Sequence, residues 1–191
     1  MTYRIGYFVG SLSSTSINRV LATALIGLAP DDLEFFEIPI RELPLYSQDY
    51  DEDYPPVAVA LKEAIDSADA VLFVTPEYNR SIPGGLKNAI DWASRPWGQN
   101  SFDHIPAAVI GASVGAIGTA VAQQSLRGVL SFCNARQMTA PEAYIQFVPE
   151  DYDDDGTVTN ASTASFLTAF MTEFRDHIER VLTVLPRDTD S

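Results

Sequence analysis

Cysteine and lysine are both scarce in this chain of 191 residues. The single cysteine, Cys133, excludes an intramolecular disulfide and any zinc site built from several cysteines. Only two of the twelve basic residues are lysines, Lys62 and Lys87, and 26 acidic residues bring the net charge to −14. A surface of this charge repels nucleic acids and anionic membranes, so we expect neither as a partner.

Long apolar runs are also missing. No stretch approaches the ~20 apolar residues of a membrane-spanning helix. The N-terminal residues Met1–Gly6 lack the basic and then apolar pattern of a signal peptide, so we expect a cytoplasmic protein. The composition is that of a globular protein, with 46% hydrophobic and 20% charged residues. The length favours a single domain over residues 1–191, with a loose tail from about residue 186.

Segments of strand and helix character alternate along the chain. Apolar, β-branched segments predict strands, and apolar residues three and four positions apart predict helices. The expected strands are 3–9, 33–38, 70–74, 107–111 and one within 138–147, and the expected helices are 17–28, 57–67, 85–94, 119–132 and 165–185. The last helix is expected to bury Phe166, Phe170, Phe174, Ile178, Val181 and Leu185. This alternation predicts an α/β fold, a flavodoxin-like three-layer sandwich with a five-stranded parallel sheet in the order 2-1-3-4-5.

Ligands of such sheets bind at the carboxyl ends of strands 1, 3 and 4. Three stretches of this chain fall there, residues 10–18, 75–85 and 112–118. We therefore expect the functional site at this edge of the sheet.

The first of these stretches links a buried strand to an amphipathic helix and contains five hydroxyl side chains. These are Ser11, Ser13, Ser14, Thr15 and Ser16. A phosphate at this position would meet free backbone N–H groups, the positive end of a helix dipole and several hydroxyl donors. The glycine-lysine motif of nucleotide triphosphatases and the two-glycine dinucleotide motif are absent, which favours a monophosphate. The alternative interpretation is an ordinary helix start with a serine cap.

The second stretch begins Pro76-Glu77-Tyr78-Asn79-Arg80 and ends Pro83-Gly84-Gly85. Its prolines stiffen the backbone, and its glycines permit close approach of a ligand. A planar heteroaromatic ring can lie here against backbone amides and the Asn79 side chain.

Together, these stretches resemble the NADPH-dependent FMN reductase family, which includes flavodoxin-like quinone, azo-dye and chromate reductases. The matching residues are Gly10-Ser11-Leu12 with Ser16 and Asn18, Pro76–Asn79, Pro83-Gly84, Leu86–Trp92, Ser113 with Gly115, and Asn134-Ala135-Arg136. The resemblance covers most of the chain, and the long central motif is more specific than the first loop.

The resemblance implies a bound FMN cofactor with NADPH or NADH as co-substrate. It assigns the FMN phosphate to Ser11, Ser13, Ser16, Ile17 and Asn18, the isoalloxazine ring to Pro76, Glu77, Tyr78 and Asn79, and the other edge of the site to Ser113, Val114, Gly115 and Ala116. It also implies a homodimer or homotetramer. We assign no catalytic side chain and no metal, because the flavin carries the chemistry. Arg80, beside the expected ring, is predicted to receive the phosphates of NAD(P)H.

One departure from the family pattern concerns the phosphate. Many members have a basic residue directly after Gly-Ser-Leu, where this chain has Ser13. The phosphate is therefore expected to lose one charge-assisted contact. Arg19 is nearby in sequence, but it lies on the predicted helix.

Three functions fit these observations. The first is an NAD(P)H-dependent FMN oxidoreductase that passes hydride from nicotinamide to flavin and on to a quinone-like or other small-molecule electron acceptor. The alternative is a flavodoxin-type electron carrier, for which the acidic surface would suit docking on basic partners. A third is a flavin-free interaction protein that has kept the fold.

Overall fold

The computed structural model describes residues 2–153 and 155–187. Its strands are β1 (Tyr3–Val9), β2 (Leu33–Glu37), β3 (Ala70–Val74), β4 (Pro106–Ser113), β5 (Arg136–Gln137) and β6 (Tyr144–Gln146). Its α-helices are α1 (Ile17–Gly27), α2 (Pro56–Asp66), α3 (Gly84–Ala93), α4 (Ala120–Phe132) and α5 (Ala161–Val184), with short 3-10 helices η1 (Gln48–Tyr50) and η2 (Pro149–Asp151). Strands and helices alternate, as the apolar pattern predicts.

The strands form one parallel sheet in the order β2-β1-β3-β4-β5, which confirms the predicted topology. Ile5 of β1 lies between Phe35 of β2 and Ala70 of β3. The central strand β3 is buried at all five positions, because helices cover both faces of the sheet. Such a strand can be continuously apolar, which is why its sequence shows no alternation.

The fifth strand differs from the prediction of a single segment within residues 138–147. It is split into β5, which pairs with the start of β4, and β6, which pairs with the end of β4. Between them the chain leaves the sheet and passes through Pro141. Proline has no N–H to donate to a sheet ladder, so a continuous strand through this position is disfavoured.

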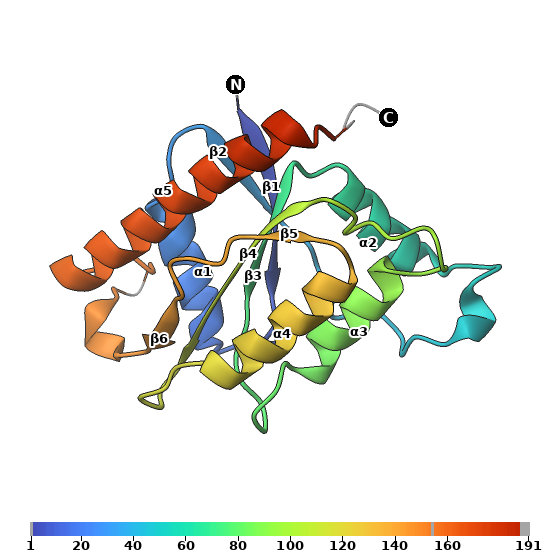
Figure 1. The fold of residues 1–191 in the computed structure, drawn as a ribbon. Helices are drawn as coiled ribbons and strands as arrows, with labels where there is room; N and C mark the ends of the chain where they lie inside the picture. Colours follow the sequence, from blue (N-terminus) through green and yellow to red (C-terminus); the bar gives the residue numbers. More distant parts are fainter. Residues whose placement is uncertain (1, 154, 188–191) are drawn as a thin grey trace.

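Two separate cores lie on the two faces of the sheet (Figure 1). Helices α1 and α5 cover one face, where Leu21, Leu25 and Phe170 are fully buried against β1, β3 and β4. Helices α2, α3 and α4 cover the other. There the rings of Phe8 and Phe73 stack with their centroids 4.9 Å apart. None of the helices described is long and apolar enough to cross a membrane.

Helix α5 starts at Asn160, whose side-chain oxygen accepts the N–H groups of Ser162 and Thr163 at 2.9 and 3.2 Å. Its buried residues are Leu167, Phe170, Met171, Phe174 and Ile178. The prediction is confirmed for Phe170, Phe174 and Ile178, whereas Val181 and Leu185 are only partly buried. It is wrong for Phe166, which is 39% exposed, because the buried stripe begins one residue later.

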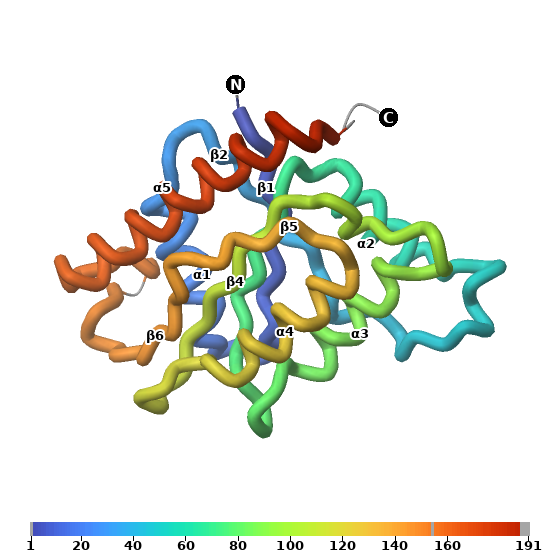
Figure 2. The backbone as a smooth tube through the Cα atoms, in the orientation of Figure 1, coloured from blue at the N-terminus to red at the C-terminus, as the bar shows by residue number. Residues whose placement is uncertain are grey.

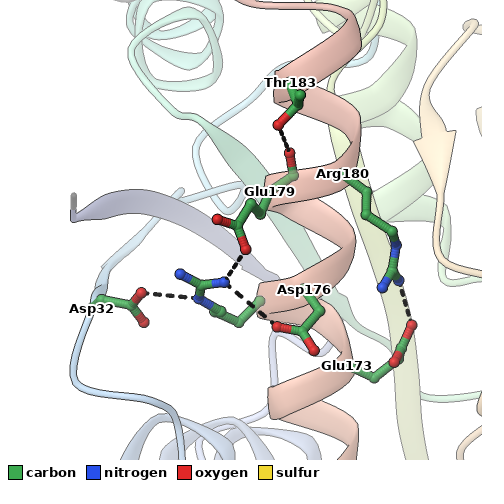
Figure 3. Close-up of polar contacts among 7 residues, drawn as sticks. Asp32, Glu173, Asp176, Glu179, Arg180 and Thr183 are labelled. Atoms are coloured by element: carbon green, nitrogen blue, oxygen red, sulfur yellow. Dashed lines mark hydrogen bonds and ion pairs between the residues drawn. The ribbon is translucent and has the colours of Figure 1, made fainter.

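Ion pairs made by arginines of α5 accompany this packing (Figure 3). The Arg175 guanidinium donates to Asp32, which precedes β2, at 2.9 Å, and it also contacts Glu179 one turn further along the helix. Arg180 pairs with Glu173. Beyond the helix, Arg187 donates to the carbonyl of Asp103 at 2.8 Å, so the chain is held at this position. The rest of the tail expected to be loose, residues 188–191, lies outside the described residues.

We expect apolar packing, rather than these ion pairs, to hold α5 on the sheet. Phe174→Ala should lower the free energy of unfolding by about 3–5 kcal/mol, because it leaves a cavity where a fully buried ring had been. Arg175→Met should cost much less, because the pairs it removes are partly exposed to water. Urea denaturation of both variants measures the difference. Equal losses would contradict this assignment.

Candidate functional site

Three loops meet at the carboxyl edge of the sheet, as the topology requires. They follow β1 (residues 10–16), β3 (residues 75–83) and β4 (residues 114–119). Figure 2 shows the last two projecting from the same end of the molecule. Every site residue predicted from the sequence lies in these loops, in the first turn of α1 or, for Ser113, at the last position of β4.

The loop after β1 is folded by its own hydroxyl groups. Ser11, which is 6% exposed, accepts the N–H of Ser13 at 3.3 Å, and Ser13 in turn accepts the N–H of Thr15 at 3.2 Å. Ser16 is the N-cap of α1, where its Oγ accepts the N–H of Arg19 at 3.3 Å. The serine cap that competed with the phosphate interpretation is therefore present, and it is compatible with a ligand at the same helix end.

Asn18 lies in the first turn of α1 with 1% of its surface exposed. Its side-chain amide donates to the carbonyl of Ala112 and accepts the N–H of Ala112, both at 2.9 Å. These two bonds join the start of α1 to β4, 94 residues away in sequence. The Asn18 side chain is thus part of the scaffold, and only its backbone N–H remains available to a ligand.

The Arg19 side chain is paired with β2. Its guanidinium makes two hydrogen bonds of 2.8 Å with the carboxylate of Glu37 at the end of β2. The Arg19 contact holds the pKa of Glu37 below its ordinary value. Arg19 therefore does not supply the positive charge that Ser13 fails to provide.

The turn after β3 is a two-residue hairpin. Tyr78 and Ser81 exchange two backbone hydrogen bonds of 3.0 Å, and the residues between them, Asn79 and Arg80, have φ angles of 51° and 64°. Positive φ at both central positions is the pattern of a type I′ turn, which asparagine tolerates and arginine does not favour. Such backbone strain is often found at functional sites.

Glu77 anchors this turn to the start of α4. Its Oε2 accepts the N–H groups of Val121 and Ala122 at 3.0 and 3.1 Å, and its Oε1 lies 3.2 Å from the Arg80 guanidinium. The side chain is 9% exposed. A carboxylate at this position both caps the helix and complements its dipole. Glu77 therefore fixes the turn through its side chain and is not free to act as a base.

The loop after β4 depends on two glycines. A methyl group at Gly111 would lie 2.0 Å from the carbonyl oxygen of Thr75, so only glycine lets the ends of β3 and β4 come this close. Gly118 has a φ of 58° and lies against the backbone of Tyr144. Between them, Val114 is 72% exposed and Ile117 is 51% exposed. The tip of this loop is thus exposed to solvent, while close backbone contacts at Gly111 and Gly118 fix its two ends.

All three loops present unused hydrogen-bond donors at this edge. Within the described residues, the backbone N–H groups of Ser14, Ile17, Asn18, Asn79, Arg80, Val114 and Ala116 donate to no protein acceptor. The Tyr78 ring is 49% exposed, and its hydroxyl lies 3.5 Å from Ser11 Oγ, which brings the first two loops into contact. A cradle of donors beside an exposed ring fits a ligand rich in acceptor atoms, such as a phosphate joined to a flavin.

Comparison with known proteins agrees with this geometry. The sequence profile of the NADPH-dependent FMN reductase family matches residues 3–150. A 2-hydroxy-1,4-benzoquinone reductase of Burkholderia sp. is 51% identical over 91% of this chain and 95% of its own length. A quinone reductase of Pseudomonas putida is 44% identical over 93% and 95% of the two chains. The solved structure of FerB, a flavoenzyme NAD(P)H:(acceptor) oxidoreductase from Paracoccus denitrificans, has 48% identity and a TM-score of 0.91, covering 94% of this chain and 98% of its own.

Sequence reasoning predicted that these loops share one edge of the sheet, but it did not predict the partners of the Asn18 and Glu77 side chains. Asn18 is three and seven positions before Leu21 and Leu25, so helical spacing puts it on the buried face of α1. This spacing indicates that its side chain bonds to the protein and not to a ligand. No local signal marks Glu77 as the cap of α4, because its partners are 44 and 45 residues away.

We expect Glu77→Ala to lower the free energy of unfolding by about 1–2 kcal/mol, the usual cost of losing a helix cap. Glu77→Gln should lose less, because the amide oxygen can still accept the N–H groups of α4. Urea denaturation of both variants measures these changes. The control is Glu63→Ala on the exposed side of α2, which should stay within about 0.5 kcal/mol of the wild type. A Glu77→Ala protein as stable as the control would show that the cap contributes nothing.

Proposed function

Because the chain belongs to the NADPH-dependent FMN reductase family, we propose that it is an NAD(P)H-dependent flavin oxidoreductase that passes hydride from nicotinamide to FMN and on to a small acceptor. The observation that carries the proposal is the set of unused backbone donors on the three loops, at the edge where this family's motifs lie. Quinones are the proposed acceptors, since two relatives over 40% identical are named quinone reductases.

We assign the FMN phosphate to the loop after β1. Ser11, Ser13 and Ser16 offer hydroxyl groups, and Ile17 and Asn18 offer backbone N–H groups at the positive end of the α1 dipole. Since the Asn18 side chain is bound to Ala112, its contribution comes from the backbone alone.

We assign the isoalloxazine ring to Pro76, Glu77, Tyr78 and Asn79 after β3. The other edge of the site is assigned to Ser113, Val114, Gly115 and Ala116 around the end of β4. Glu77 contributes by its backbone, because its carboxylate caps α4. When bound, FMN supplies a ring that accepts hydride from nicotinamide and returns electrons to the acceptor. The protein then needs no catalytic acid or base and supplies position, backbone donors and an open face.

The electron-carrier alternative has less support. The relatives compared above are named as reductases or oxidoreductases. The Pro-Glu-Tyr-Asn turn is also among the residues that carry the resemblance to the reductase family. The acidic surface alone does not distinguish the two functions.

We also propose a homodimer or homotetramer in the cytoplasm. Trp97 and Phe132, which are 78% and 72% exposed, lie side by side with ring centroids 6.4 Å apart. Large apolar side chains exposed together are typical of surfaces that are covered in an assembly. A cytoplasmic location would give the enzyme access to reduced nicotinamide nucleotides.

An anaerobic absorbance experiment tests the function directly. The purified protein, mixed with FMN and desalted, should keep a yellow flavin spectrum that bleaches when NADPH or NADH is added. Reoxidation by a benzoquinone should restore the spectrum. Flavin that is retained but is not bleached by either nucleotide would favour the carrier, and loss of flavin on desalting would count against the FMN assignment.

Arg80 is the proposed contact for the phosphates of NAD(P)H. Its side chain is 68% exposed beside the ring site, and its one ion pair within the described residues, with Glu77, leaves other donors for a ligand. We expect Arg80→Ala to raise the nicotinamide KM about tenfold through loss of a charge-assisted contact, with kcat nearly unchanged. Arg80→Lys should recover part of the loss. Steady-state kinetics measure both, and an unchanged KM for Arg80→Ala would refute the assignment.

A further inference from the structure

The loop after β1 has no positive charge of its own. Residues 10–18 contain no lysine or arginine, and the nearest one along the helix, Arg19, is bound in a bidentate ion pair to Glu37. A phosphate monoester on this loop would therefore meet only neutral donors from these residues. Hydrogen bonds from a charged donor are about twice as strong as neutral ones, so a cation supplied from elsewhere would change the affinity appreciably.

One arginine from a distant segment reaches this loop. Arg41 lies four residues beyond the end of β2, and its Nη2 donates to the backbone carbonyl of Leu12 at 2.5 Å. Leu12 stands directly before Ser13, within the loop that is assigned to the phosphate. The guanidinium is thus fixed beside the phosphate loop by a bond to the loop itself.

The position of Arg41 is set by the sheet. After β2, the N–H of Ile38 donates to the carbonyl of Tyr7 at 2.9 Å, and Ile38 and Ile40 are both buried. A methyl group at Gly6 would lie 2.5 Å from Ile38, so glycine at this position of β1 allows the segment to approach. Since alternate residues of an extended segment face opposite sides, the anchoring of Ile38 and Ile40 leaves Arg41 exposed at the carboxyl edge.

The charge of Arg41 is not neutralised in the described part of the chain, where its guanidinium forms no ion pair with an aspartate or glutamate. One of its five N–H donors is used on Leu12, and the planar group keeps a face and further donors for a second acceptor. A guanidinium that one hydrogen bond holds in place, and whose charge has no carboxylate partner, is suited to bind a phosphate.

We propose that Arg41 supplies the cationic contact to the FMN phosphate, in place of the basic residue absent at Ser13. This inference rests on the proposed FMN function and names the residue that completes its phosphate site. Arg41 is a binding residue for the cofactor and takes no part in hydride transfer.

Flavin binding to the full chain, freed of flavin, tests the assignment. FMN and riboflavin are titrated by fluorescence quenching at low and at moderate salt. Arg41→Gln should raise the Kd for FMN at least about tenfold and leave the Kd for riboflavin, which has no phosphate, unchanged. Arg41→Lys should lose less. The dependence of FMN affinity on salt should be weaker in Arg41→Gln than in the wild type.

The matched control is Arg180→Gln on α5, which changes the net charge by the same amount at a side chain paired with Glu173. Its flavin affinities should equal those of the wild type.

An unchanged FMN Kd in Arg41→Gln would overturn the inference and leave the proposed function intact. Equal weakening of FMN and riboflavin would also overturn it, by showing that Arg41 only shapes the loop. A rise in the NADPH KM with unchanged FMN affinity would assign the residue to the other nucleotide. Wild-type protein that binds neither flavin would refute the proposed function itself, and the inference with it.

Discussion

The site depends on a pair of hydrogen bonds between Asn18 and the backbone of Ala112. A buried amide must satisfy both its donor and its acceptor, and here one peptide unit of β4 satisfies both. This pairing fixes the start of α1 relative to the end of β4. The free N–H groups of the first loop therefore keep a constant position relative to the third loop. Glu77 does the same for the second loop by capping α4. The donors can thus remain unused in the absence of ligand without the loops closing on one another.

The arrangement also explains how a protein of net charge −14 can hold an anion. Most of the attraction comes from backbone N–H groups and a helix dipole, which carry no net charge. Few cations are then needed. Of those near the site, Arg19 is paired with Glu37 and Arg80 partly with Glu77, while Arg41 has no ion pair within the described residues. The acidic surface and the anion site are therefore compatible, because the site draws on backbone geometry and not on composition.

Sequence reasoning predicted the fold well because the fold depends on local pattern. The buried strands and amphipathic helices have strong periodicities, and their alternation restricts the topology to a few arrangements. The two errors have different causes. The fifth strand divides at Pro141, which is a local signal, whereas the buried stripe of α5 begins at Leu167 because of how the helix lies on the sheet. The site likewise has a part that the sequence pattern predicts and a part that it does not. The topology predicts where the three loops lie, whereas the contacts of Glu77 and Arg41 are with residues 44 and 29 positions away.

The two glycines of β4 and its loop set which parts of this edge can change during evolution. At Gly111 any side chain would collide with Thr75, and at Gly118 with the backbone of Tyr144, so both positions are closed to substitution. Val114 and Ile117, between them, face solvent and pack against little. New side chains at these two positions would alter the shape of the solvent-exposed edge of the site, while the hydrogen bonds that fix the bases of the three loops stay in place. A lineage can therefore vary the molecules it reduces by changing the tip of this loop at little cost to folding, and Ile117 can change without altering a residue assigned to the cofactor.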